Sequence, residues 1–305
     1  MLAYVTATLV FAGLYALMAL GLNVVWGLAG MVNLGLVGFF GLGAYASALL
    51  TLRLGWPMPL AWAAAALVAA AAGAALALLV ARLRGDYLAI VTLGFAEVIR
   101  LVASNEVWLT NGTDGISGIP GPWRGTLSPQ GFNLACLGLV WAAVAVAFAA
   151  LARLSHSPFG RVLRAVREDD QVAAVAGKPV LSFRLRAFAL GAAVTGLAGA
   201  LYAHYNAYVA PEGFAPLITI YVVLALTAGG VGSMRGAVLG ALLLLALTEG
   251  TRFLAALVPG VAPVQQAALR EGTIALALIL LLRFRPQGLL PERSRTPPAT
   301  AGGPP

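Results

Sequence analysis

Residues 134–154 read LACLGLVWAAVAVAFAALARL, an apolar run whose one charged side chain, Arg153, stands next to its end. An α-helix needs about 20 apolar residues to cross the hydrocarbon core of a bilayer, and this stretch supplies them. The run therefore predicts a membrane-spanning helix, and the same pattern extends along the chain on both sides of it.

The whole chain has the composition of a membrane protein. Of its 305 residues, 61% are hydrophobic and 10% are charged, and the mean hydropathy is +0.91. Soluble domains average about 45–50% apolar and about 25% charged residues. So few charges cannot cover a water-soluble surface of this size, which excludes a soluble enzyme and a disordered chain. The single cysteine, Cys136, also excludes an intrachain disulfide.

Apolar runs predict an all-α, polytopic integral membrane protein of about nine spans, with eight or ten as alternatives. We place the spans near residues 2–20, 34–52, 60–81, 88–102, 134–154, 188–209, 217–228, 237–257 and 267–282. They make one transmembrane domain over residues 1–291. The Pro-rich tail, 292–305, is expected to be disordered and cytoplasmic.

Glycines interrupt the region from Asn23 to Gly43, so the second span is expected to be broken or irregular. Broken helices at membrane depth persist only where protein or a watery cavity satisfies their backbone, and glycine-interrupted spans point to a transport path. Asn23, Asn33, Gly41 and Gly43 are therefore candidates for the translocation path. Close helix packing by small residues is the alternative.

Two spans carry an acidic and a basic residue three positions apart, which places each pair on one helix face. The pairs are Glu97 with Arg100 and Glu249 with Arg252. Charges in a bilayer are costly and usually face protein or water. Glu97 and Arg100 are candidates for the path, and a structural pair near the outer membrane edge is the alternative reading for both pairs.

Basic residues cluster on one side of the predicted spans. With the N-terminus outside, 14 of the 19 Lys and Arg residues fall in the inner turns and the tail, which predicts an N-out, C-in topology. The first run lacks a basic flank and is expected to be a retained span rather than a signal peptide. The scarcity of lysine beside eighteen arginines is typical of a GC-rich bacterial genome, and we expect a bacterial plasma (inner) membrane. The net charge of +8 is then a marker of topology and not of nucleic-acid binding.

The inner loop, about 154–186, contains a polar segment that is expected to form a helix along the cytoplasmic face. Ser157 and Pro158 are typical of a helix start, and Gly177 of its end. Small and apolar residues share one face, while basic and acidic residues occupy the others. We predict a docking surface for a cytosolic motor at Arg161, Arg164, Arg167, Glu168, Asp169, Asp170, Ala173, Ala174 and Gly177. A solvated, positively flanked loop is the alternative.

Motifs of catalysis are missing from the sequence. It holds neither His-Glu-x-x-His nor Gly-x-Ser-x-Gly, and its one lysine, Lys178, precedes a proline instead of the Ser or Thr of a P-loop. We expect a non-enzyme that needs no cofactor or metal and that cannot hydrolyse ATP through a P-loop of its own.

Several stretches resemble one family. The segments RLRGDYLAIVTLGFAEVIR at 82–100, GISGIP at 115–120, GGVGS at 229–233 and RPQGLL at 285–290 are similar to M-type permease subunits of branched-chain amino acid ABC importers, the Liv system. So is the inner segment SPFGRVLRAVREDDQVAA at 157–174. The likeness extends from about residue 14 to 291.

The resemblance implies a set of partners. Such a permease pairs with a homologous second permease, two cytosolic ATPases dock beneath, and an extracytoplasmic binding protein delivers the amino acid. It also implies that the 161–177 helix is the coupling helix. Here Asp-Asp-Gln-Val separates Glu168 from Ala173 and Ala174, and Lys178-Pro179 follows the glycine; both depart from the general importer pattern.

The expected mechanism is ATP-driven alternating access for leucine, isoleucine, valine or a related amino acid. Three alternatives stay open. The first is an ABC permease for urea, amides or other amino acids. The second is an ion-coupled secondary transporter with Glu97 or Glu249 as a proton site, and the third is a membrane scaffold.

Overall fold

A computed structural model describes residues 2–81, 83, 85–256 and 263–292, and for residues 2, 252–256, 263, 264, 266, 267 and 270 it describes the backbone alone. The predicted tail, 292–305, lies outside this part of the chain except for Glu292.

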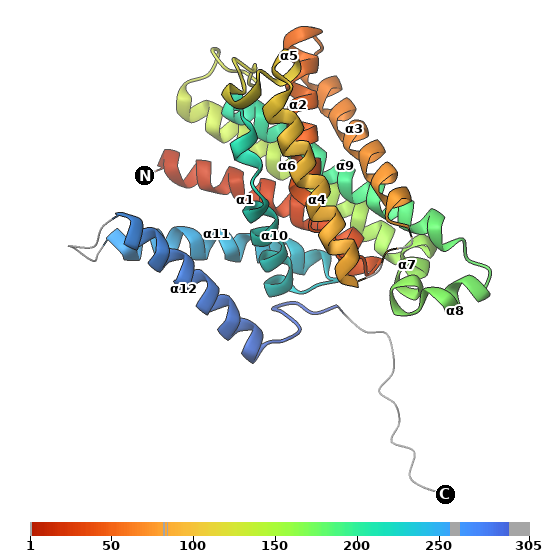
Figure 1. The fold of residues 1–305 in the computed structure, drawn as a ribbon. Coiled ribbons are helices and arrows are strands. Elements are labelled where there is room, and N and C mark those ends of the chain that lie inside the picture. Colours follow the sequence, from red (N-terminus) through yellow and green to blue (C-terminus); the bar gives the residue numbers. More distant parts are fainter. Residues whose placement is uncertain (1, 82, 84, 257–262, 293–305) are drawn as a thin grey trace, which may run out of the picture.

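Helices make up most of the described chain (Figure 1). The first half holds α1 (Leu2–Leu22), the π-helical turn η1 (Asn23–Leu28), α2 (Leu36–Arg53), α3 (Met58–Leu79), α4 (Gly85–Asn105), α5 (Val107–Thr110), η2 (Gly112–Asp114), β1 (Ile116–Ser117) and α6 (Pro129–His156). The second half holds α7 (Pro158–Glu168), α8 (Asp170–Val175), α9 (Val180–Asn206), β2 (Tyr208–Val209), η3 (Pro211–Phe214), α10 (Pro216–Gly229), α11 (Met234–Ala256) and α12 (Pro263–Phe284).

Eight helices of the described chain are long and apolar enough to cross a membrane. They coincide with the first eight predicted spans, and this confirms an all-α, polytopic membrane protein. The ninth predicted span, 267–282, falls on α12. For some residues of α12 the structure describes the backbone and not the side chain.

Helix α9 packs at the centre of the bundle, against α2 and α3. The face of α3 toward it consists of residues four positions apart, Ala61, Ala65, Ala69 and Gly73, all buried. On α2, a Cβ added at Gly43 would lie 2.0 Å from the Gly196 carbonyl oxygen of α9. Small residues thus let the backbones approach closely, as is usual where lipid supplies no hydrophobic driving force between helices.

The irregular backbone that we expect in the second span precedes the helix of that span, α2, in the sequence. Helix α1 continues into η1, and residues 29–35 follow without helix before α2 begins at Leu36. Helix α2 itself is regular over its 18 residues. Gly30, at φ +72°, makes the turn out of η1.

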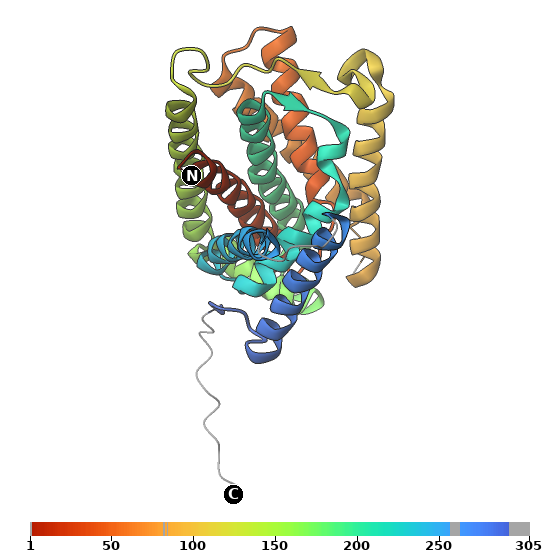
Figure 2. The same ribbon diagram turned by 90° about the vertical axis from the view of Figure 1, so that its left-hand side faces the viewer.

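The bundle has two distinct ends. At one, which we call the β end, β1 pairs antiparallel with β2, and the His204 ring lies 2.6 Å from the Pro120 carbonyl oxygen. The other, the α7 end, carries α7, α8, the turn after α3, the turn between α10 and α11, and residues 285–292. Helices α1 and α11 run obliquely to the others, and α11 and α12 project from the bundle on the side of the N-terminus (Figures 1 and 2).

Candidate functional site

The inner loop begins as its sequence predicts. Ser157 caps α7, its hydroxyl oxygen accepting a bond from the Gly160 amide at 3.4 Å, and Pro158 takes the first helical position. Leu163 and Val166 of this helix are buried against the bundle. A Cβ added at Gly160 would lie 2.4 Å from the Ser155 carbonyl oxygen, so α7 sits directly on the end of α6.

The single helix expected over 161–177 is wrong, because the segment divides at Asp169. Asp169 is extended (φ −154°, ψ 111°), and its carboxylate accepts bonds from the amides of Gln171 at 2.8 Å and Val172 at 3.0 Å. A side-chain oxygen that satisfies the free amides of a helix's first turn is an N-cap. Asp169 therefore ends α7 and starts α8.

Helix α8 stands away from the bundle with its apolar residues outward. Val175 is 91% exposed and Val172 is 64% exposed, whereas Ala173 is buried. Ala174 and Gly177 are exposed as well, and Gly177 turns the chain at φ +76°. The expected face of small and apolar residues, which comprises Val162, Val166, Ala173 and Ala176, is thus only partly right: Val166 and Ala173 are buried, but Ala176 is exposed.

Helix α8 is attached to the bundle by an ion pair at its start. The Arg184 guanidinium of α9 donates to the Asp170 carboxylate at 2.7 Å and to the Ala81 carbonyl oxygen at 3.3 Å. Both side chains of the pair are largely buried, at 17% and 12% exposure. Asp170 therefore orients α8 within this chain, whereas Glu168 is exposed at the junction of the two helices.

Arg167 connects α7 to the membrane helices. Its guanidinium donates to the Gly27 carbonyl oxygen of η1 and, at 2.8 Å, to the Glu292 carboxylate. Arg164 lies 3.9 Å from the same carboxylate, while Arg161 is exposed and donates within the loop to the His156 carbonyl oxygen. Within the described chain, Arg164 and Arg167 thus contact Glu292 or η1, whereas Arg161 stays at the surface of the loop.

A polar cleft of about 410 Å³ lies beside these contacts at the α7 end. Its wall carries charged side chains from Arg167, Glu168, Asp169, Asp170 and Arg184. Gly30 and Leu88 are among the other lining residues. The cleft joins the loop, the segment after η1 and the start of α4.

Asn23 is buried within η1 and joins it to the turn between α10 and α11. Its Oδ1 accepts from the Gly232 amide at 2.8 Å, and its Nδ2 lies 3.4 Å from the Met234 sulfur. Gly230 and Gly232 of that turn have φ of +119° and +86°, which only glycine adopts readily. Asn23 therefore connects η1 to the turn between α10 and α11.

Asn33 is also buried and shapes the start of α2. Its Oδ1 accepts from the Gly35 amide at 2.9 Å. Thr92 of α4 accepts from the Leu34 amide at 3.0 Å, and Thr219 of α10 accepts from the Val37 amide at 3.1 Å. Side chains from three parts of the chain thus satisfy amides that a helix start leaves open.

Gly41 and Gly43 lie at helix contacts in the described chain. A Cβ at Gly41 would meet the Phe214 ring at 3.3 Å, and Gly43 faces Gly196. Glu97 and Arg100 bond each other at 2.5 and 3.0 Å on a half-exposed face of α4. The structure does not gather the six predicted path residues into one site; their part in a path stays a prediction.

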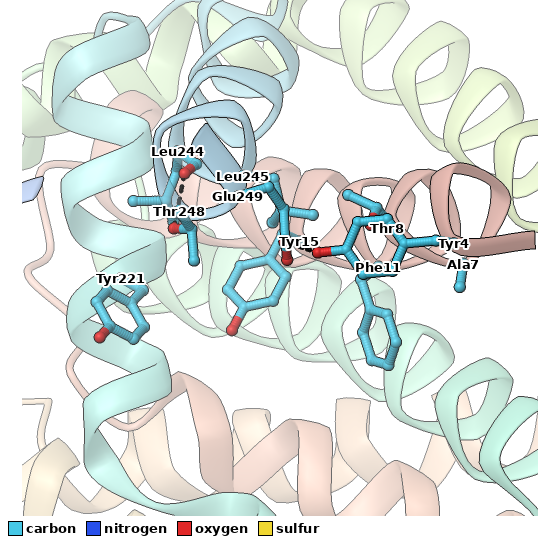
Figure 3. A pocket seen from close by; sticks show the side chains of 10 residues that line it. All are labelled: Tyr4, Ala7, Thr8, Phe11, Tyr15, Tyr221, Leu244, Leu245, Thr248 and Glu249. Carbon is cyan, nitrogen blue, oxygen red and sulfur yellow. Dashed lines mark hydrogen bonds between the residues drawn. The ribbon is translucent and has the colours of Figure 1, made fainter. Parts of the chain in front are cut away.

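A cavity that the sequence reading did not single out lies between α1, α10 and α11 and measures about 310 Å³ (Figure 3). Helix α1 lines it with Tyr4, Ala7, Thr8, Phe11 and Tyr15. Helix α10 adds Tyr221, and α11 adds Leu244, Leu245, Thr248 and Glu249. The Tyr4 hydroxyl donates to the Glu249 carboxylate across the cavity. The sequence signal for this cavity is the spacing of polar and aromatic residues at positions 4, 8, 11 and 15, which places them on one helix face.

A family model described as "Branched-chain amino acid transport system / permease component" matches residues 4–282. The chain belongs to this family. Among its relatives, the high-affinity branched-chain amino acid transport system permease protein LivM of Escherichia coli is 35% identical over 91% of this chain and 68% of its own. A probable LivM of Methanocaldococcus jannaschii is 27% identical over 96% and 95% of the two chains.

The permease family also includes a second type of relative. The permease protein LivH of E. coli is 26% identical over 75% of this chain and 79% of its own. No solved structure matches the chain significantly. Since the relatives are transport permeases, this member of the family is a multi-pass transport subunit and not an enzyme.

Proposed function

We propose that the chain is the membrane-spanning permease subunit of an ATP-driven importer of branched-chain amino acids. The observation that carries the proposal is the inner loop, in which an exposed helix, α8, is joined to a second helix, α7, that is bonded to the membrane spans. A permease needs both a contact for its motor and a connection from that contact to its spans.

Helix α8 is the proposed contact for a cytosolic ATPase. Its outward valines offer apolar area that is favourable to bury, at about 25 cal/mol per Å². Glu168 and Arg161, both exposed, place charges of either sign beside it. Such charges favour one orientation of a partner over others.

Helix α7 is the proposed transmitter. A displacement of α7 would pull η1 through the bond from Arg167 to Gly27, and η1 would move the α10–α11 turn through the bond from Asn23 to Gly232. These two bonds connect α7, which is joined to the docking helix α8, with η1 at the end of α1 and with the turn between α10 and α11. Helices α1, α10 and α11 line the 310 Å³ cavity.

The proposed topology places the α7 end in the cytoplasm and the N-terminus outside. The positive-inside rule supports it, since Arg153, Arg184, Lys178 and the basic turn of α7 flank spans at that end. Two ATPases would dock from below, an extracytoplasmic binding protein would approach the β end, and a homologous second permease would complete the path.

In the proposed cycle, ATP binding closes the ATPases and moves α8, which shifts α7 and opens the path outward to receive the amino acid. Hydrolysis resets the loop and opens the path inward. The two states alternate access to one site, so the amino acid crosses without an open pore.

The test is purification of the chain with its partner subunits, together with leucine uptake into proteoliposomes. We expect an ATPase to co-purify, and we expect Gly177→Trp and Glu168→Lys to abolish both its co-purification and uptake. Glu106→Lys, the same charge change at the β end, is the control and should retain the co-purified ATPase. Uptake by this chain alone, driven by a proton gradient and abolished by Glu97→Gln, would contradict the proposal.

A further inference from the structure

The segment that follows α12, residues 285–292, runs back toward the end of α10 (Figure 1), and we call it the strap. The Leu289 amide donates to the Ala228 carbonyl oxygen, and the Leu290 amide donates to the Gly229 carbonyl oxygen, both at 2.9 Å. The last carbonyl groups of an α-helix have no partner within their own helix. The strap therefore satisfies two such groups at the end of α10.

Glycines let the strap lie directly on the turn between α10 and α11. A Cβ added at Gly230 would lie 2.4 Å from the Leu290 carbonyl oxygen, and one at Gly288 would lie 2.6 Å from the backbone of Gly230. A Cβ added at Gly232 would lie 2.5 Å from a carboxylate oxygen of Glu292. Because the strap and the turn pack backbone against backbone, we expect the end of α12 and this turn to move together.

Glu292, at the far end of the strap, joins it to the inner loop. The Nη1 atom of Arg167 donates both to the Glu292 carboxylate, at 2.8 Å, and to the Gly27 carbonyl oxygen of η1. Arg164 lies 3.9 Å from the same carboxylate. The three charged side chains are 27–28% exposed. Glu292 thus supplies negative charge to two arginines of α7 beside the point where α7 meets η1.

The carboxylate of Glu292 contributes more to the position of Arg167 than the carbonyl of Gly27 does. A carbonyl oxygen attracts the guanidinium as a dipole, whereas a carboxylate adds the attraction between two full charges to the hydrogen bond. The long arginine side chain loses rotamer freedom when it is held in one place. Without the carboxylate, less opposes the turning of Arg167 toward water through its exposed part.

We propose that the strap makes the end of α12 follow the inner loop, and that Glu292 is the positioning residue that keeps Arg167 bound to η1. This inference rests on the proposed function and adds α12 to the helices that the motor moves. A displacement of α7 reaches the strap through Arg167 and Glu292. It then reaches the end of α10 through the two backbone bonds of the strap.

The test is leucine uptake per ATP hydrolysed by the complete importer, reconstituted in proteoliposomes with its ATPases and binding protein. Glu292→Gln removes the charge and keeps the size of the side chain. We expect the ATPase to co-purify as before and uptake per ATP to fall about tenfold, as for loss of one charge-assisted hydrogen bond. Glu292→Asp keeps the charge and should retain most of the uptake.

Two further variants separate positioning from a general effect on the fold. Glu271→Gln makes the same exchange at an exposed position of α12 and should leave uptake per ATP unchanged. In an Arg167→Ala background, Glu292→Gln should cause little further loss, because residues that act through one contact have non-additive effects.

A backbone variant tests the other attachment of the strap without a change of charge. Leu289→Pro removes the amide that bonds to the Ala228 carbonyl oxygen. We expect it to lower uptake per ATP as well, with the ATPase still co-purifying.

Three results would overturn this inference and leave the proposed function standing. They are unchanged uptake per ATP in Glu292→Gln, additive losses in the double variant, and loss of ATPase co-purification in Glu292→Gln. The second would show that Glu292 acts independently of Arg167, and the third that Glu292 belongs to the docking contact. If the unaltered importer takes up no branched-chain amino acid, the proposed function itself is wrong.

Discussion

The two helices of the inner loop are neighbours in sequence but are held in different ways. Helix α7 buries Leu163 and Val166 and is bonded through Arg167 to η1 and to Glu292. Helix α8 buries Ala173 and holds to the bundle through the ion pair of Asp170 with Arg184, while Val172 and Val175 are exposed. The difference teaches that α7 is part of the membrane bundle, whereas α8 keeps an exposed apolar surface, which is the contact we propose for the ATPase.

The largest effect is expected from a charge on α8. Val175→Asp should weaken ATPase binding roughly 100-fold, because it removes about 1.5–3 kcal/mol of apolar burial and adds the cost of desolvating an unpaired charge. The thermal midpoint of the isolated chain should not change, since Val175 is 91% exposed. Titration of ATPase onto the permease in nanodiscs measures the affinity, and an unchanged Kd would show that α8 is not the contact.

A substitution on α7 should separate docking from transport. Arg167→Ala should leave ATPase co-purification intact, because Arg167 faces η1 and Glu292. Loss of a partly buried hydrogen bond to a charged group costs about 1.5–3 kcal/mol, so leucine uptake per ATP hydrolysed should fall about tenfold. Arg186→Ala, at an exposed arginine of α9 outside the proposed contact, is the control. If the uptake per ATP stays the same in Arg167→Ala, α7 does not transmit motion through this bond.

A smaller effect is expected from an added side-chain atom where α7 packs on the end of α6. Gly160→Ala places a Cβ 2.4 Å from the Ser155 carbonyl oxygen and should destabilise the fold by about 1–3 kcal/mol. Gly94→Ala, in α4, meets nothing within 4 Å and should be neutral or slightly stabilising, as Ala favours a helix by about 1 kcal/mol over Gly. Thermal denaturation in detergent compares the two, and equal midpoints would contradict the close seat of α7 on α6.

The smallest effect is expected at the junction of the two helices. Asp169→Ala removes the cap of α8 and should cost about 1 kcal/mol of local stability, whereas Asp169→Asn keeps a capping oxygen and should cost a few tenths. Amide hydrogen exchange of Gln171 and Val172 measures the change, since their amides bond to Asp169. Equal protection in the two variants would argue against a capped break at this position.

The sequence predicts the spans well because each depends on local composition, and residues 134–154 need no tertiary contact to be recognised. It also predicts the start of α7, since Ser157 and Pro158 act on their own helix. The break at Asp169 has a local signal as well, because Asp169 and Asp170 are residue types that can cap a helix. The amphipathic pattern continues across this position, however, and therefore predicts one helix instead of two.

Contacts between distant segments could not be predicted in this way. The bond of Glu249 with Tyr4, 245 residues away, is an example, because the spacing Glu249-x-x-Arg252 gives no sign of a partner on α1 or of the cavity that Glu249 lines. The sequence marks Asn23 and Asn33 as polar residues of a glycine-interrupted region and hence as candidates for the path. Which partners they meet depends on how α4, α10 and the α10–α11 turn pack around them.

Crosslinking from single cysteines tests most directly that α8 is the contact of the motor. Cys136 is buried and can be replaced by serine, after which Val175→Cys on α8 and Trp108→Cys at the exposed β end are each labelled with a short photocrosslinker in the assembled importer. The account predicts crosslinks to the ATPase from position 175 and none from position 108. An ATPase crosslink from 108, or its absence from 175 in an active complex, would contradict it.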